Sequence, residues 1–176
     1  WLSEDDRADE AIVALRQALD QAPNDPAIMS LMAQAHQRNG SRGLAGEMLS
    51  LAVEASGSAP DESVAYARFL VSEENLSSAE SILVDSLRVS PNNQPVLEFL
   101  GQIYVAQQDW PRLQQVEATL RRLPDNVGVG AADALQVARL RGQGRADEAV
   151  SFLEEMAAAA GAGSPADVSI VRQRLA

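Results

Sequence analysis

The stretch ADEAIVALRQALDQAPND, residues 8–25, decides the fold, because its skeleton recurs further along the chain. Ala11, Ala45 and Ala79 are each 34 residues apart, and a leucine follows four residues after each of them. Small or apolar residues follow again after seven and eight residues. Side chains at these offsets share one face of an α-helix. The sequence therefore predicts one kind of amphipathic helix that occurs repeatedly and buries the same face each time.

A second apolar segment precedes each later copy of this helix, and a short polar turn separates the two. The three segments are DPAIMSLMAQAHQRNG (residues 25–40), PDESVAYARFLVSEEN (60–75) and NQPVLEFLGQIYVAQQD (93–109). They are rich in Ala, Gln and Glu, which favour helix over strand. Pro23, Pro91 and Pro124 follow the repeated helices, where a proline stops a helix. We therefore expect an all-α chain of helix pairs without a β-sheet.

The composition excludes several classes of protein. The net charge of the 176 residues is −11, and all 14 basic residues are arginines, so the basic surface that nucleic acids need is absent. The chain has no cysteine, which excludes disulfides, thiolate catalysis and cysteine-based zinc sites. No apolar run reaches the roughly 18 residues of a membrane span. We expect neither nucleic-acid binding nor membrane insertion, while the cytoplasm and the periplasm both stay open as locations.

These segments resemble the tetratricopeptide repeat (TPR) family, whose unit is a helix–turn–helix of 34 residues. The clearest match is LEFLGQIYVAQQDW, in which Leu100, Gly101 and Tyr104 stand at family positions and Leu97 replaces the usual tryptophan. The family's Ala-x-x-x-Phe/Tyr pattern in the second helix has leucine in place of the aromatic residue. The resemblance implies an all-α TPR solenoid, an α–α superhelix of about ten antiparallel helices.

The expected organisation is a single repeat array over residues 1–176, which we interpret as a fragment of a longer chain. Its expected parts are a partial repeat (1–23), three repeats (24–57, 58–91 and 92–124), an irregular repeat (125–161) and a terminal helix (164–176). Leu113 and Glu117 depart from the family's alanine and aromatic residue, and VGVGAADALQVARLRGQG (127–144) resembles a degraded first helix. Residues 1–6 are expected to be the remnant of a separate preceding helix.

Candidates for catalysis or metal binding are few. His36 is the only histidine, and it stands at a position that the family uses for packing between helices. The segment GVGAAD (128–133) lacks the preceding strand and the full glycine pattern of a phosphate loop. The acidic residues between Glu4 and Glu10 lack the spacing of a calcium loop. Because the sequence offers no nucleophile–base pair and no metal cluster, we expect no enzyme, no cofactor and no metal.

The resemblance implies a protein–protein interaction scaffold whose concave groove binds a peptide or protein segment. The groove residues carried over from the family's first helices are Ser30, Gln34, Gln37, Arg38, Val64, Arg68, Val71, Glu98, Gln102 and Val105. Arg38 and Arg68 would suit an acidic partner, since arginine binds a carboxylate through two hydrogen bonds. Three alternatives stay open: these residues are solvated surface, the chain is a structural spacer or oligomerisation segment of a larger bacterial envelope or polysaccharide-export protein, or it forms a homodimer through its terminal helices.

Overall fold

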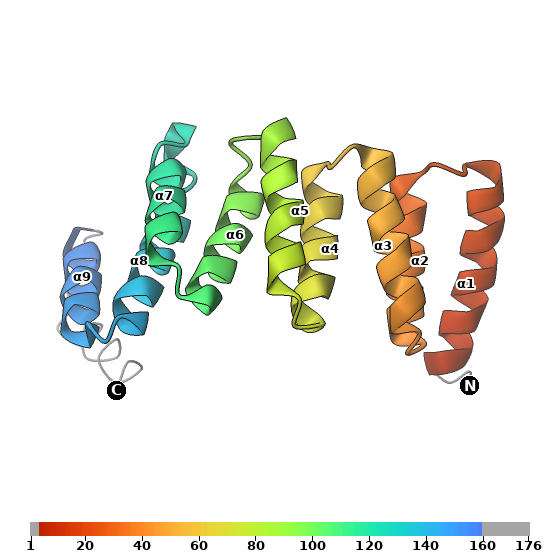
Figure 1. The fold of residues 1–176 in the computed structure, drawn as a ribbon, viewed down its shortest axis with the longest axis horizontal. Coiled ribbons are helices and arrows are strands. Elements are labelled where there is room, and N and C mark those ends of the chain that lie inside the picture. The colour runs from red at the N-terminus through yellow and green to blue at the C-terminus, as the bar shows by residue number, and fades with distance from the viewer. Residues whose placement is uncertain (1–3, 160–176) are drawn as a thin grey trace. The chain divides into compact units, whose positions relative to one another are not determined.

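The computed structural model of the chain describes residues 4–159, which form nine α-helices and one short 3₁₀-helix and contain no β-strand. The helices are α1 (Glu4–Gln21), α2 (Pro26–Arg38), α3 (Arg42–Ser56), α4 (Pro60–Ser72), α5 (Leu76–Val89), α6 (Gln94–Gln107), α7 (Trp110–Arg121), the 3₁₀-helix η1 (Pro124–Asn126), α8 (Val129–Gly142) and α9 (Ala146–Ala159) (Figure 1). The predicted all-α helical-repeat fold is confirmed. The terminal helix predicted over residues 164–176 lies outside the described residues.

The chain divides into two compact units, residues 1–99 and 100–176. In the first unit each helix packs against its neighbours in sequence: α2 contacts α1 and α3, and α4 contacts α3 and α5. Short connections make consecutive helices antiparallel (Figure 1). None of the described helices combines the length and the hydropathy that crossing a membrane would require.

The alanines of the repeated pattern lie where the helices of the first unit meet. Ala45 and Ala52 of α3 and Ala79 of α5 are fully buried, at 0% exposure. Leucines four residues after the alanines fill the space beside them, and Leu83 is also 0% exposed. Small side chains at the contact let two helices approach closely, and the leucines then supply the buried apolar area. The 34-residue spacing therefore sets the position of the core in each helix pair.

The ends of the helices follow from the local sequence. The Asp25 carboxylate accepts hydrogen bonds from the N–H groups of Ala27 (2.9 Å) and Ile28 (3.3 Å), and Pro26 stands in the first turn of α2. This combination satisfies the free N–H groups at a helix start. At the other end of a pair, α3 stops at Gly57, whose φ of 64° is the left-handed conformation that glycine adopts without strain.

A buried ion pair joins α7 to α8 in the second unit. Arg139 Nε donates to Glu117 Oε1 at 2.8 Å, and Arg139 Nη2 donates to Glu117 Oε2 at 3.1 Å. Glu117 is 3% exposed and Arg139 is 9% exposed. Beside this pair, Arg121 Nη2 donates to Asp133 Oδ1 at 2.8 Å and to Gln136 Oε1 at 2.7 Å. Glu117 stands where the family has an aromatic residue, and the negative charge that it places in the core is neutralised by Arg139 on the next helix.

Two sequence-based expectations about helices were wrong. The segment that resembled a degraded helix forms the regular 14-residue helix α8, because its glycines stand at the two ends and none interrupts the interior. Residues 4–6 are not part of a separate helix, because α1 begins at Glu4 and continues without a break to Gln21. No Gly or Pro separates these residues from the rest of α1, and acidic residues are favourable at a helix N-terminus.

Candidate functional site

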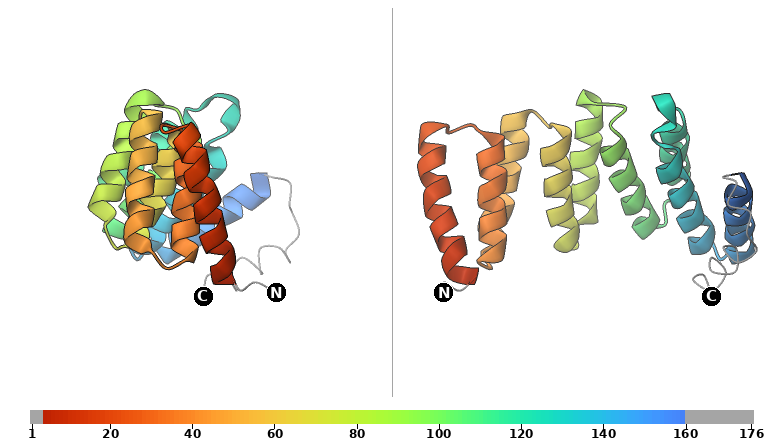
Figure 2. Two further views of the ribbon diagram at one scale, coloured as in Figure 1. Left: turned by 90° about the vertical axis from the view of Figure 1, so that its right-hand side faces the viewer. Right: turned by 180° about the vertical axis from the view of Figure 1, so that it is seen from behind.

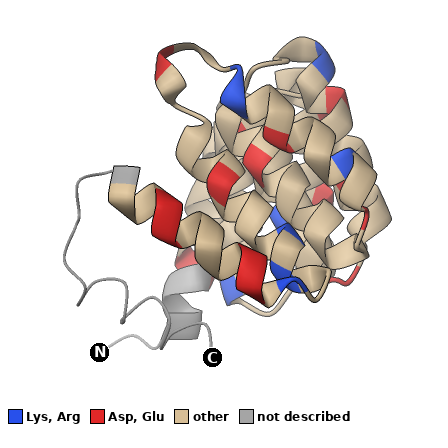
Figure 3. Cartoon of the chain, turned by 90° about the vertical axis from the view of Figure 1, so that its left-hand side faces the viewer, with Lys and Arg blue, Asp and Glu red and all other residues tan. Residues whose placement is uncertain are grey.

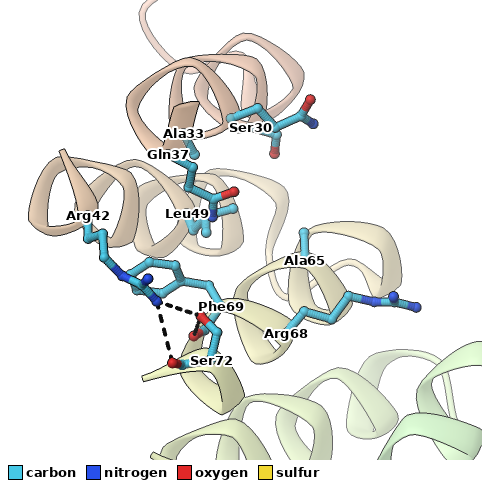
Figure 4. A pocket seen from close by; sticks show the side chains of 10 residues that line it. Ser30, Ala33, Gln37, Arg42, Leu49, Ala65, Arg68, Phe69 and Ser72 are labelled. Atoms are coloured by element: carbon cyan, nitrogen blue, oxygen red, sulfur yellow. Dashed lines mark hydrogen bonds between the residues drawn. The ribbon is translucent and has the colours of Figure 1, made fainter. Parts of the chain in front are cut away.

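A pocket of about 500 Å³ lies in the first unit, between α2 and α4 and over α3. The residues that line it are Ser30, Ala33, Gln34 and Gln37 of α2, Arg42 and Leu49 of α3, and Ala65, Arg68, Phe69 and Ser72 of α4 (Figure 4). The lining comes from three consecutive helices of two repeats. The packing of successive repeats, rather than any single motif, therefore creates the pocket.

The floor of the pocket is apolar. Ala33 is 0% exposed and Leu49 is 4% exposed, while Ala65 and Phe69 are half-buried. The Phe69 ring can lie close to α3 because Gly46 has no side chain: a Cβ atom there would be only 2.8 Å from Phe69 Cε1. Phe69 also stacks on Tyr66, with ring centroids 6.5 Å apart. An aromatic wall is thus held in place against the alanine-lined floor.

The rim of the pocket is polar and carries two arginines. Gln34, Gln37, Arg42 and Arg68 are exposed, so their side chains are available to a ligand from solvent. These two positive charges stand out because the chain as a whole has a net charge of −11. Other helices carry only acidic charge: α9, for example, has acidic but no basic residues (Figure 3). A pocket with an apolar floor and a few polar groups at its mouth is the usual form of a ligand site in proteins.

Arg42 is held in a defined position at one side of the pocket. Its Nε donates to Glu73 Oε1 at 2.5 Å. Its Nη2 donates to Ser72 Oγ at 3.2 Å and to the Ser72 carbonyl oxygen at 3.4 Å (Figure 4). The Ser72 hydroxyl in turn donates to the Phe69 carbonyl oxygen at 2.7 Å. The start of α3 is therefore tied to the end of α4, and the guanidinium group stays beside the pocket.

Arg68 is held differently, because its partner is an aromatic ring. The guanidinium carbon lies 5.4 Å from the centroid of the Phe99 ring, within the range of a cation–π contact. Within residues 4–159, no hydrogen bond or ion pair uses the Arg68 guanidinium group, so its donors are open to other acceptors. Arg68 can therefore form a bidentate interaction with a carboxylate without first breaking an ion pair.

The structure brings together part of the predicted groove. Ser30, Gln34, Gln37 and Arg68 line the pocket, whereas Arg38 is exposed on α2 and does not. The other predicted residues do not line it either: Val64 and Val71 are half-buried on α4, and α6 carries Glu98 (half-buried), Gln102 (exposed) and Val105 (half-buried).

Sequence reasoning missed Arg42, Phe69 and Ser72. The family register predicts which faces of the first helices point into a groove, but Arg42 belongs to a second helix. Its ion-pair partner Glu73 is 31 residues away, so no local pattern marks the pair. Phe69 could have been found from Gly46, because a glycine inside an amphipathic helix often marks the close approach of another group.

His36 and the acidic residues do not gather into a metal site in the described part of the chain. His36 is 5% exposed within α2, and its Nδ1 has no hydrogen-bond partner among the described residues, which suits a packing role. Residues 4–159 contain no cluster of three or more His, Asp or Glu side chains that could hold a metal ion.

Comparison with known proteins identifies the repeat. Residues 2–66 match the family model described as tetratricopeptide repeat. No curated protein matches the chain.

Solved structures with a similar fold cover most of the chain. One crystal structure of MamA protein has a TM-score of 0.67 at 16% identity, and the match covers 86% of this chain and 81% of that one. A second MamA structure has a TM-score of 0.62 at 16% identity, covering 88% and 92%. A thermophilic TPR protein of Thermus thermophilus has a TM-score of 0.60 at 19% identity, covering 96% and 90%. At these identities the likeness concerns the fold.

Proposed function

Because this chain is a tetratricopeptide-repeat protein, we propose that it is a protein-interaction scaffold whose first unit binds an acidic peptide segment in the pocket between α2 and α4. The repeat fold generally mediates protein–protein interaction, and its members are typically scaffolds without enzymatic activity. The peptide, its acidic character and the choice of this pocket are the parts of the proposal that go beyond the fold.

The observation that carries the proposal is the pairing of an arginine-bearing rim with an apolar floor. Arg42 and Arg68 stand on two different helices beside a floor formed by Ala33, Leu49 and Phe69. This arrangement suits a ligand that offers a carboxylate next to an apolar side chain. Gln34 and Gln37 add amide groups that can donate to and accept from a peptide backbone.

The experiment measures the affinity of the chain for labelled peptides by fluorescence anisotropy. The peptides share their apolar residues and differ in the number of Asp and Glu residues. We expect the affinity to rise with peptide acidity and to fall with added salt, since exposed charges are screened. A hydrogen bond to a charged group contributes about 1.5–3 kcal/mol, so Arg68→Glu should weaken binding by roughly 10- to 100-fold or more.

Two matched variants give the controls. Arg88→Glu makes the same charge change on α5, at an exposed residue that pairs with Asp85 and does not line the pocket, so it should leave the affinity within about twofold. Arg38→Glu tests whether the peptide binds in the pocket or in the wider groove predicted from the sequence. Arg38 lies on the same helix as Gln34 and Gln37 but does not line the pocket. Equal losses in all three variants would indicate a non-specific charge effect and contradict the proposal, as would an affinity that does not depend on peptide acidity.

A further inference from the structure

The smallest of three equivalent residues lines the pocket between α2 and α4. Positions 31, 65 and 99 are 34 residues apart on successive first helices, and they hold Leu31, Ala65 and Phe99. Of these three residues it is Ala65 that lines the pocket. A space of about 500 Å³ is thus open beside the position where the neighbouring repeats carry a leucine or an aromatic ring.

The next repeat shows where an aromatic ring lies when it is present at this position. The ring of Phe99 has its centroid 5.4 Å from the guanidinium carbon of Arg68 on α4. The equivalents of these two residues, 34 positions earlier, are Ala65 on α4 and Gln34 on α2, and both line the pocket. These two helices lie side by side (Figure 2, right). The chain therefore places its own ring beside Arg68 and leaves the equivalent place beside Gln34 open.

The walls of the open place suit a flat aromatic ring. The Phe69 ring lines the pocket, and it is oriented by its stacking on Tyr66, with 18° between the two ring planes. Ala33 and Leu49 add an apolar floor that is closed to solvent from below. Aromatic pairs contribute interaction energy beyond the apolar area that they bury. A further ring beside Phe69 is therefore favoured over an aliphatic side chain of similar size.

We propose that the pocket takes an aromatic side chain of the bound peptide, which lies over Ala65 and against the Phe69 ring, as the counterpart of Phe99 in the next repeat. The acidic residue of the peptide stays at the arginine-bearing rim, so the ligand is a segment in which an aromatic residue adjoins an acidic one. This inference rests on the proposed function, because it names the side chain that the same pocket takes. It makes Ala65 and Phe69 the residues that determine specificity.

A series of acidic peptides tests the choice of side chain. The peptides carry the same fluorescent label and differ only in one residue next to the acidic residue, which is Ala, Leu or Phe; anisotropy measures their affinities. Burial of the phenylalanine side chain should raise the affinity by about 10- to 100-fold over the Ala peptide. Contact with the Phe69 ring should make the Phe peptide bind about two- to tenfold more tightly than the Leu peptide. Equal affinities of the Leu and Phe peptides would overturn the proposal.

Substitutions at position 65 fill the pocket from within. Ala65→Phe gives α4 the residue that α6 carries at the equivalent position, and it should lower the affinity for the Phe peptide by about tenfold or more. Ala65→Leu copies α2 in the same way and serves as the second variant if the larger ring disturbs the fold in a thermal melt. Ala55→Phe is the matched control, because Ala55 is exposed on α3 and does not line the pocket, and it should change the affinity less than about twofold. An unchanged affinity in folded Ala65 variants would overturn the proposal.

Phe69→Leu separates the contact between rings from the burial of apolar area. It should reduce the preference for the Phe peptide over the Leu peptide to about twofold or less, while the dependence of affinity on peptide acidity is retained. Phe99→Leu removes a ring that does not line the pocket, so it should leave this preference unchanged. An equal loss of preference in the two variants would contradict the role of Phe69.

Two uncharged probes distinguish a failure of this inference from a failure of the proposed function. N-acetyl-phenylalanine amide and N-acetyl-leucine amide are each titrated at millimolar concentration into the ¹⁵N-labelled chain, and amide shifts are followed by NMR. We expect shifts centred on the pocket residues of α2 and α4 with the first probe, weaker shifts with the second, and loss of both in Ala65→Phe. If these shifts occur but peptide affinity does not depend on acidity, the proposed function fails and the aromatic subsite stands. If affinity depends on acidity but neither the Phe probe nor the Phe peptide is preferred, this inference is overturned and the proposed function stands.

Discussion

The buried ion pair between Glu117 and Arg139 leads to the sharpest prediction about stability. Replacing Glu117 with Leu leaves the guanidinium group of Arg139 with no counter-charge at a position that is 9% exposed. Removing one partner of a buried pair costs about 3–5 kcal/mol, because the remaining charge stays out of water. For a chain of this length each kcal/mol corresponds to roughly 2–4 °C, so the Tm should fall by about 6–20 °C.

The double variant separates the energy of the pair from the cost of an unpaired charge. Glu117→Leu with Arg139→Leu removes both charges and leaves apolar side chains between α7 and α8. Such replacements are neutral or stabilising by about 1–4 kcal/mol, so the double variant should regain most of the lost stability. Urea denaturation followed by circular dichroism measures the free energy of unfolding of the wild type, the two single variants and the double variant.

A neighbouring pair on the same two helices provides the control. Arg121 and Asp133 also join α7 to α8, but their side chains are 35% and 14% exposed. Arg121→Leu should therefore cost only about 1 kcal/mol or less, as partly solvated pairs do. The reasoning would be refuted by a loss below about 1 kcal/mol for Glu117→Leu, or by additive losses in the double variant.

Three further predictions concern single positions. Gly128→Ala should destabilise the chain by about 1–3 kcal/mol, because its Cβ would lie 2.2 Å from the Leu120 carbonyl oxygen, whereas Gly130→Ala, with no atom within 4 Å of its Cβ, should be neutral or stabilising in the same thermal melts. Asp25→Ala should cost about 1 kcal/mol through loss of the cap of α2, while Asp25→Asn, which keeps an acceptor oxygen, should cost little by urea denaturation. Hydrogen bonds from the backbone and side chain of Arg112 hold the pKa of Asp109 below its ordinary value of 3.8, so its contribution to stability is complete above that value and is lost as the pH falls through the lower folded-state pKa. Asp109→Asn should therefore flatten the acid side of a plot of stability against pH, and an unchanged profile would contradict this.

The fold could be predicted because its determinants are local and repeated. The spacing of Ala11, Ala45 and Ala79 repeats a pattern that lies within single helices, and turn residues such as Pro26 and Gly57 mark the ends. The start of α1 was missed because the sequence interpretation divided the chain after Asp6, although no Gly or Pro interrupts residues 4–21. The expected degradation of α8 was wrong because glycines at helix ends cost far less than glycines inside a helix.

The candidate site could be predicted only in part, because much of it depends on contacts between helices. The register of the first helices predicted that Gln34, Gln37 and Arg68 share a surface, and they line the pocket. Arg42 gives no local signal, since its partners belong to the end of the next first helix. The sequence shows Glu117 at a position that should be buried, but no local pattern marks its partner Arg139. Arg139 stands out only when the repeats are aligned, because the equivalent positions, ten residues before the start of each repeated pattern, hold the uncharged residues Ala35, Phe69 and Ile103.

The ion pair between α7 and α8 also has a consequence for how a repetitive chain finds its correct neighbours. Units that share one apolar interface can pair in the wrong order during folding, because each first helix offers a similar surface. The positions equivalent to Arg139 in α2, α4 and α6 are Ala35, Phe69 and Ile103, and none of them carries a charge. Among the described first helices, only α8 carries a cation at this position, so mispaired intermediates that bury the Glu117 carboxylate there should be less stable. One charged contact thus favours the native pairing of α7 with α8 over pairings that place an apolar residue opposite Glu117.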